Sequence, residues 1–499
     1  MRHVLVVPNT KKWPLDIPGV EVVGGRKYLT EESFATGAAR VYNLAKSYRY
    51  QSLGYYVSLL AEARGHRPLP SVNTVEDWKS RSLVRFYSEE LDDRIQSSLK
   101  PIKASTFTLS IYFARNLAKR YDRLSLDLFN LFPAPLLRAD FERDAKDGRW
   151  HLRRIGPIAA SEIPDSHQSF VVEAAKTYFG KRRRSRRKAP RRYDLAILFD
   201  PNEGQTRPSD EKAIKRFIAA AEKVGLEPEI ISKEDFGRLS EFDALFIRAT
   251  TNVKDYTYRF ARRAEAAGLV VMDDPTSILR CTNKVYLAEL LNRHRIRAPR
   301  TMVIHRKNQD KVIEALGLPC VLKQPDGCLS LGVVRADTPE ELHREASRLL
   351  EHSDLIIGQE FLPTDFDWRV GILDGKPLYV CRYFMAPKHW QVMNHGLGQK
   401  AKKQDVEGRT ETLAVEQAPA VVLRTALRAA SLIGNGLYGV DLKQVGEQCY
   451  VVEVNDNPSL DSGCEDAVIG MDLYLTVMRS FVRRLDERRG AAAQKPVPG

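Results

Sequence analysis

The stretch Tyr438-Gly-Val-Asp-Leu-Lys-Gln-Val-Gly-Glu-Gln-Cys-Tyr-Val-Val-Glu-Val-Asn455 has two β-rich runs on either side of the turn Val445-Gly-Glu447, which predicts a β-hairpin. Because alternate side chains of a strand share a face, Glu453 and Asn455 point the same way, and Asp441 on the partner strand can join them. Oxygen ligands on a rigid hairpin are typical of Mg²⁺ sites in nucleotide chemistry. A solvated strand face is the alternative, but the run is otherwise apolar, so these polar side chains need a partner.

Further upstream, the short apolar strand Leu318–Lys323 ends in a lysine and runs into the loop Gly327-Cys-Leu-Ser330-Leu-Gly332. A glycine-bearing loop between two β segments can donate backbone N–H groups to phosphates. Lys323 would add a positive charge for the phosphate oxygens. The loop fits neither the Walker A nor the G-x-G-x-x-G consensus. The order of lysine, glycine-bearing loop and carboxylate hairpin is much more specific evidence for a nucleotide site than any one of these segments alone.

Two more strands are predicted between the loop and the hairpin. The apolar run 354–363 ends at Pro363, which leaves backbone groups free to face an adenine edge. The run 365–373 alternates with period two, so Asp367 and Arg369 share a face. A carboxylate suits ribose hydroxyls, and an arginine suits a developing phosphoryl oxyanion. An exposed Asp–Arg pair is the alternative interpretation.

Taken together, these segments resemble the ATP-grasp superfamily, specifically its RimK-type glutamate ligase branch, over residues 193–485. The motifs are Asn283-Lys284, Lys323 with the G-x-x-S-x-G loop, Gln359-Glu-Phe361, Asp367-x-Arg369, Gly439-Val-Asp441 and Glu453-Val-Asn455-x-x-Pro. The resemblance implies an α/β protein in which an ATP-grasp fold, two α+β lobes that clamp ATP, follows a small α/β domain.

The resemblance also implies roles for single residues. Phosphate contacts would come from Lys284, Lys323, Gly327, Ser330 and Gly332, while the backbone of Glu360, Phe361 and Leu362 would hold adenine and Asp367 the ribose. Asp441, Glu453 and Asn455 would ligate two metal ions, Mg²⁺ or alternatively Mn²⁺. Arg369 and Lys323 are the candidate catalytic residues, and Arg369 would stabilise the transferring phosphoryl group.

One segment departs from the family pattern. Where RimK-type ligases carry Arg-Ser-Asn near the γ-phosphate, this chain reads Lys388-His-Trp-Gln391-Val-Met-Asn394. Gln391 stands in place of the arginine, and Asn394 matches only with a one-residue shift. Ser330 also replaces a loop glycine, which should stiffen the loop. We therefore count Gln391 and Asn394 as candidate substrate-binding residues. Ser459, which follows the proline of the Glu453-Val-Asn455-x-x-Pro motif, is a further candidate.

The 499-residue chain has room for three domains. We expect an N-terminal domain at 1–178, a basic linker at 179–192, a small α/β domain at 193–275, an ATP-grasp catalytic domain at 276–485 and a disordered tail at 486–499. Arg248 falls at the end of a predicted strand in the small domain, where open α/β sheets place ligand sites. It is a further candidate for substrate binding, with a surface arginine as the alternative.

Residues 1–178 resemble the N-terminal domain attached to some RimK-like ATP-grasp proteins, whose role the resemblance does not supply. Apolar runs at Val4–Val7 and Val20–Val23 suggest strands, and Thr36–Gln51 and Leu53–Arg64 suggest amphipathic helices. The pattern as a whole predicts an α/β unit.

Composition and charge bear on the location of the protein and on its partners. The six cysteines form no C-x-x-C pair, which favours a reduced, cytoplasmic location. No apolar run approaches the roughly 20 residues of a membrane span, so no membrane contact is expected. The net charge is +14, but residues 181–192 contain nine Lys or Arg, and without them it is +5. Like-charged blocks stay extended, so this run is best interpreted as a linker; a tether for ribosome, RNA or an acidic substrate is the alternative.

The sequence therefore predicts an ATP-dependent carboxylate–amine ligase that forms an amide bond through an acyl phosphate. One substrate would be an amino acid, glutamate by resemblance, and the other a carboxylate-bearing peptide, protein, carrier or small molecule. Two alternatives stay open. One is an ATP-binding regulatory or interaction protein without ligation, which the departing segment favours. The other is a ribosome- or nucleic-acid-binding protein, for which no aromatic-interleaved RNA motif is present.

Overall fold

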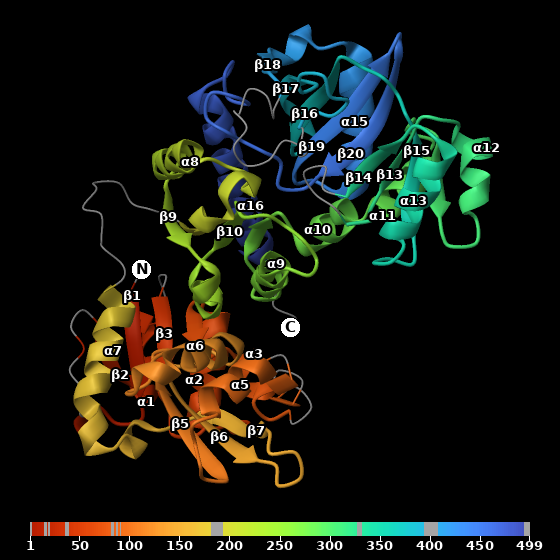
Figure 1. Ribbon diagram of the computed structural model, residues 1–499. Coiled ribbons are helices and arrows are strands. Elements are labelled where there is room, and N and C mark those ends of the chain that lie inside the picture. Colours follow the sequence, from red (N-terminus) through yellow and green to blue (C-terminus); the bar gives the residue numbers. More distant parts are fainter. Residues whose placement is uncertain are drawn as a thin grey trace. The chain divides into compact units, whose positions relative to one another are not determined.

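The computed structural model describes residues 2–13, 17, 20–34, 39–80, 84–85, 88–89, 91–180, 193–326, 332–393 and 408–493. The chain forms two compact units (Figure 1). The first comprises Met1–Ala189 with Glu234–Glu241, and the second Pro190–Lys233 with Phe242–Gly499. The basic run at 181–192 lies outside the described residues.

The first unit contains a parallel sheet in the order β2-β1-β3-β4 and an antiparallel sheet in the order β5-β6-β7. Helices pack against both, and the larger of its buried clusters is aromatic and aliphatic, including Phe129, Phe132 and Phe141. Its strands are β1 Arg2–Val7, β2 Glu21–Gly24, β3 Ala39–Asn43, β4 Arg67–Leu69, β5 Thr106–Tyr112, β6 Leu136–Arg143 and β7 Trp150–Pro157. Its helices are α1 Gly25–Thr30, α2 Leu53–Ala63, α3 Val72–Asp77, α5 Asp92–Leu99, α6 Asp122–Leu131 and α7 Gln168–Gly180.

The helix predicted at Thr36–Gln51 is wrong, because residues 39–43 form the central strand β3. All five are buried, and β3 pairs in parallel with both β1 and β4. Because Arg40 and Asn43 are buried together with their apolar neighbours, the run lacks the apolar–polar alternation of a half-buried strand, and its periodicity did not identify it as β structure. The neighbouring prediction is confirmed: α2 begins after Ser52, whose hydroxyl accepts from the Tyr55 N–H.

The second unit contains three sheets, in the orders β11-β10-β8-β9, β12-β15-β13-β14 and β18-β17-β16-β19-β20. Its strands are β8 Tyr193–Leu198, β9 Leu226–Ile231, β10 Ala244–Ile247, β11 Val270–Met272, β12 Thr301–Ile304, β13 Cys320–Lys323, β14 Val333–Ala336, β15 Ile356–Glu360, β16 Phe366–Leu373, β17 Lys376–Phe384, β18 Thr410–Leu413, β19 Leu437–Val445 and β20 Gln448–Asn455. Its helices are α8 Glu211–Lys223, α9 Tyr256–Ala266, α10 Pro275–Thr282, α11 Lys284–Arg293, α12 Val312–Leu316, α13 Pro339–Leu349, α15 Ala420–Ile433 and α16 Met471–Ala493.

Helix α16 joins the two segments that we expected to form separate domains at 193–275 and 276–485. It packs against α8, and the ring of Tyr474 lies 4.7 Å from that of Phe217 in a shared core. The helix also continues to Ala493, so the part of the predicted disordered tail from 486 to 493 is helical. Asp486 accepts a 2.6 Å hydrogen bond from the Tyr193 hydroxyl, which anchors this last part.

Two expectations from composition concern disulfides and membranes. The cysteines of the described part, Cys281, Cys320, Cys381, Cys449 and Cys464, are free thiols. Cys328 lies outside that part. Among the described helices, none combines the length and the apolar character that a bilayer crossing requires.

Candidate active site

One cavity of the second unit, about 370 Å³ in volume, is lined by side chains from the sheets β12-β15-β13-β14 and β18-β17-β16-β19-β20. We call it the central pocket. Of the residues predicted for the site, its lining includes Lys284, Lys323, Glu360, Phe361, Leu362, Asp367, Arg369, Gln391, Asp441, Glu453, Asn455 and Ser459. The strand-borne motifs, which lie far apart in the sequence, therefore meet at one place.

The predicted metal ligands come together through strand register. Asp441 lies opposite Glu453 in the β19–β20 pair and opposite Arg369 in the β16–β19 pair. The Arg369 guanidinium donates to both carboxylate oxygens of Asp441, with Nη2 2.7 Å from Oδ2, and Asn455 Nδ2 donates to Oδ2 at 3.1 Å. Burial raises the pKa of Asp441 although Arg369 lowers it. The hairpin thus presents adjacent oxygen donors on one face, as the sequence indicated.

Lys284 reaches the same face from the first residue of α11. Its Nζ lies 2.9 Å from Glu453 Oε1, and its backbone N–H donates to the Pro325 carbonyl at 2.8 Å. The side chain of Asn283 caps this helix by accepting from the next two free N–H groups. Burial pushes the pKa of Glu453 up, but Lys284 and then Lys323 outweigh it, so that this pKa lies below its ordinary value.

Lys323, at the end of β13, also lines the pocket. Burial lowers the pKa of its ammonium to about 8; Glu453 opposes this shift, while Lys284 adds to it. A partly buried cation with this balance of neighbours is stabilised by an additional anion. Of the adjoining loop, Gly332 is described and lies outside the pocket lining, with φ of +74°, whereas Gly327 and Ser330 lie outside the described residues.

Asp367 lies on the same strand as Arg369, and its carboxylate is held by a cation that the sequence analysis missed. Lys443 Nζ donates to Asp367 Oδ1 at 2.6 Å and to Thr364 Oγ1 at 2.8 Å. Lys443 stands two residues after Asp441 on β19, so the alternation that grouped Glu453 with Asn455 would have placed it on the pocket face.

The predicted adenine segment follows β15 and borders an aromatic pair. The Glu360 carboxylate is turned to Arg300, whose backbone N–H and Nε donate at 2.7 and 2.6 Å. The ring of Phe361 lies edge to face with that of Trp390, 5.9 Å between centroids. Trp390 also lines the pocket and belongs to the departing segment, where we had looked only for an arginine and an asparagine. A flat aromatic face here suits a purine base.

Of the four candidate substrate-binding residues, two line the central pocket. Gln391 and Ser459 line the pocket, and Asn394 lies outside the described residues. Arg248 does not line the pocket: it is fully buried and donates to Ser209 Oγ, to Asn457 Oδ1 and to backbone carbonyls. Burial lowers the pKa of its guanidinium to about 10. This geometry gives Arg248 a structural role, because protein acceptors already occupy its donors, and it does not support carboxylate binding.

Three carboxylates of the segment after β20 also line the pocket, and the sequence analysis did not select them. They are Asp456, Asp461 and Glu465, which we call the acidic wall. Glu465 accepts from the Tyr383 hydroxyl at 2.5 Å and from the Asp461 N–H at 2.7 Å. Burial raises the pKa of Asp456 to about 6 and also raises that of Glu465. They lie in a segment without a regular strand or helix, so no strand or helix periodicity in the sequence pointed to them.

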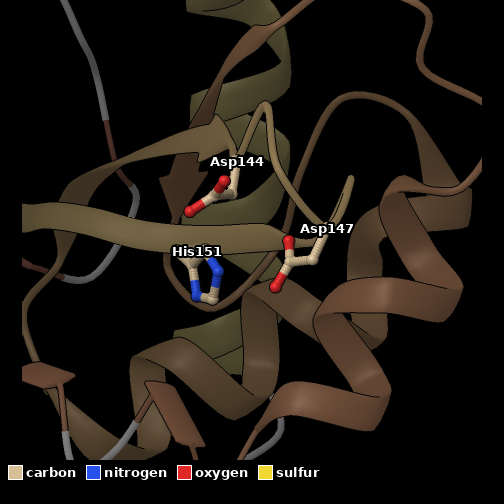
Figure 2. Close-up of side chains that lie close together, drawn as sticks. All are labelled: Asp144, Asp147 and His151. Carbon is tan, nitrogen blue, oxygen red and sulfur yellow. The ribbon is translucent and has the colours of Figure 1, made fainter.

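In the first unit, Asp144 and Asp147 of the β6–β7 turn lie within reach of His151 on β7 (Figure 2). All three are exposed, and both aspartates accept from backbone N–H groups two residues further on, at Lys146 and Arg149. Such local turns are common without a metal ion, so these residues do not compete with the central pocket.

Comparison with known families decides the class of the chain. Residues 281–480 match the RimK-like ATP-grasp domain, and residues 25–174 match the RimK-like ATPgrasp N-terminal domain. This chain carries both RimK-like domains. Its second unit has the ATP-grasp fold, and the chain is a ligase of the ATP-grasp family, whose members bind ATP.

Curated relatives of this RimK-like protein are ligases. It is 27% identical over 227 residues to the probable alpha-L-glutamate ligase 1 of Pseudoalteromonas atlantica, covering 45% of this chain and 71% of that one. It is 26% identical over 259 residues to the alpha-aminoadipate–LysW ligase LysX of Saccharolobus solfataricus, covering 49% and 88%. Among solved structures, the RimK domain ATP-grasp protein of Sphaerobacter thermophilus is 15% identical, with a TM-score of 0.44 and coverage of 57% and 98%.

Proposed function

We propose that the protein is an ATP- and Mg²⁺-dependent carboxylate–amine ligase that forms an amide or peptide bond through an acyl phosphate. One observation carries the proposal: the pairs Lys284–Glu453 and Arg369–Asp441 lie in one pocket together with the half-buried Lys323. Carboxylate and amide oxygens are the ligands that Mg²⁺ prefers, and lysine and arginine are the usual partners of phosphate. The side chains present therefore fit a magnesium–nucleotide complex, and Mn²⁺ has the same preference for oxygen.

The two ion pairs suggest how the site accepts such a complex. Each pair joins a group that prefers a phosphate oxygen to a group that prefers a divalent cation. Binding of Mg²⁺ and ATP would exchange both partners, so that Lys284 and Arg369 turn to phosphate while Glu453 and Asp441 turn to the metal. The buried charges would stay neutralised throughout, which keeps the desolvation cost of the exchange low.

The chemistry needs positioning and charge neutralisation, and no protein nucleophile. An oxygen of the substrate carboxylate attacks the γ-phosphorus, the bond to the β–γ bridging oxygen breaks, and ADP leaves. The nitrogen of the amine then attacks the acyl carbon, the carbon–oxygen bond to phosphate breaks, and phosphate leaves as the nitrogen loses a proton. Bound Mg²⁺ supplies charge neutralisation at the phosphate oxygens. Arg369 would stabilise the transferring phosphoryl group.

The names of the relatives support an amino acid as the amine substrate and a peptide, protein or carrier as the carboxylate substrate. The test is ADP formation with Mg²⁺ across the twenty amino acids, each with pooled carboxylates, followed by mass spectrometry of the product. We expect amine-dependent ADP release and a product lighter by one water than its two substrates combined. ATP binding without amine-dependent ADP release would instead identify an ATP-binding regulatory protein.

A further inference from the structure

The segment that follows β20 folds back over the strands that carry the predicted metal ligands. Asn455 is the last residue of β20, and Asn457 has a φ of +38°, in the left-handed region that asparagine and glycine enter more readily than other residues. Pro458 lies against Gly439, where an added Cβ atom would come within 2.7 Å of the Pro458 Cβ. Gly439 is the cross-strand neighbour of Asn455 and shares a strand face with Asp441, so this contact lies on the metal-binding face.

Three hydrogen bonds hold Asn457 in this conformation, and their partners lie at the carboxyl ends of two strands of the sheet β11-β10-β8-β9. The Asn457 N–H donates to Asp273 Oδ2, which follows β11. Its Oδ1 accepts from Arg248 Nη1, and its Nδ2 donates to the Ala249 carbonyl, both after β10. Each of these distances is 2.6 Å. The side chain of Asn457 is therefore bound through both its oxygen and its nitrogen.

Arg248 makes the largest number of these links between the small sheet and the segment after β20. Its Nη2 also donates to the Pro458 carbonyl at 2.9 Å. Its Nε lies 3.1 Å from Ser209 Oγ, which donates in turn to the Leu460 carbonyl at 2.9 Å. Arg248 and Asn457 are both buried, so water competes little for these bonds. A planar guanidinium holds several acceptors in fixed directions, which the ammonium of a lysine cannot reproduce.

The metal-binding end of β20 is the part that these bonds keep in place. Asn455 Nδ2 donates to Asp441 Oδ2 at 3.1 Å and to the Gly439 carbonyl at 3.4 Å. With its nitrogen engaged there, the amide oxygen is the atom that Asn455 can offer to a cation. Asn457 lies only two residues further on, at most about 7 Å of chain, so a shift of Asn457 moves this amide. Groups behind a metal ligand affect metal affinity because they set the orientation of that ligand.

We propose that Arg248 is a positioning residue for the metal site. Through Asn457 it fixes the end of β20, and thereby the amide of Asn455, without touching metal or nucleotide itself. The inference rests on the proposed function for the metal. A purely structural Arg248 would differ in one respect: its loss would lower stability and leave the metal affinity of the folded protein unchanged.

The test measures how much Mg²⁺ strengthens nucleotide binding. Isothermal titration calorimetry of a non-hydrolysable ATP analogue into the full chain gives its dissociation constant in EDTA and with Mg²⁺, and the ratio of the two is the gain from the metal. No turnover is needed, and unfolded protein lowers the stoichiometry without changing the ratio. The variants are Arg248→Lys, which keeps the charge and loses the planar fork, and Asn457→Gly, which keeps the N–H and suits the positive φ.

Each variant should lower the gain from Mg²⁺ at least about threefold, with the affinity in EDTA nearly unchanged. Arg280→Lys is the matched control and should leave the gain unchanged, because the Arg280 guanidinium also donates to backbone carbonyls, of Leu432 and Ile433, but lies outside the described pocket lining. An unchanged gain in both variants overturns the inference and leaves the Mg²⁺ site standing. A wild-type ratio of one overturns the proposed Mg²⁺ site, and the inference with it.

The double variant tests whether Arg248 acts through Asn457. If it does, the combined loss in Arg248→Lys/Asn457→Gly should be clearly smaller than the product of the two single losses. A loss as large as that product would show independent effects and would overturn the inference. If Arg248→Lys does not fold, Asn457→Gly decides alone, because an unchanged gain in that folded variant contradicts the proposed route to Asn455.

Discussion

Replacing Lys323 with methionine should abolish ADP formation and yet stabilise the protein without nucleotide. Burial lowers the pKa of Lys323 from 10.5 to about 8, and this difference corresponds to roughly 3 kcal/mol of disfavoured charge in the folded state. Methionine has a similar volume and no charge, so at pH 7 the variant should gain about 1–3 kcal/mol in its free energy of unfolding. Losing a charge-assisted contact to phosphate should weaken ATP binding by about 1.5–3 kcal/mol.

The lowered pKa of Lys323 also predicts how the free energy of unfolding changes with pH. Between pH 8 and 10.5 the unfolded chain holds a proton on Lys323 that the folded chain has released, so wild-type stability rises with pH across this window. Below about pH 8 the full penalty is present, and above 10.5 it vanishes. Urea denaturation at pH 7 and pH 10 should therefore show an advantage for the variant that shrinks at the higher pH. Lys376→Met removes an exposed charge of the same unit and should change little.

Three outcomes would contradict this reasoning: a Lys323→Met protein less stable than wild type at pH 7, a stability difference that does not depend on pH, or wild-type ADP formation by the folded variant. The first two would show that burial does not disfavour the charge. The third would remove Lys323 from the nucleotide site.

Glu453→Gln and Asn455→Ala should each raise severalfold the Mg²⁺ concentration that gives half-maximal ADP formation, because a hard cation loses an oxygen ligand. An unchanged Mg²⁺ concentration in both variants would show that the polar face of the hairpin is only structural. If the purine lies against Trp390, ATP should quench the tryptophan fluorescence of the wild-type protein, and Trp390→Leu should remove this quenching and weaken ATP binding by about 0.5–1.5 kcal/mol. Equal quenching in the variant would place the purine elsewhere. Replacing residues 181–192 by a neutral Gly/Ser linker of equal length should leave ADP formation unchanged, both with free amino acids and with macromolecular acceptors. A loss of activity confined to macromolecular acceptors at low salt would instead show electrostatic steering by the basic run.

The sequence by itself determined the components of the second unit. Alternation along single strands placed Glu453 with Asn455 and Asp367 with Arg369, because side-chain direction in a strand follows from position in the chain. Glycine and proline marked the ends of those strands. The order of the motifs then indicated the family, which the match over residues 281–480 supports.

Only the tertiary structure decided which of these residues meet. Arg369 lies opposite Asp441, 72 positions away, through the pairing of β16 with β19. Residues 39–43 became a strand because they pair with β1 on one edge and with β4 on the other. Arg248 gained a structural role from acceptors more than 200 positions away, and the acidic wall gained its place from the packing of an irregular segment. Local periodicity is a property of consecutive residues, whereas charge pairing and burial depend on segments that only the folded chain brings together.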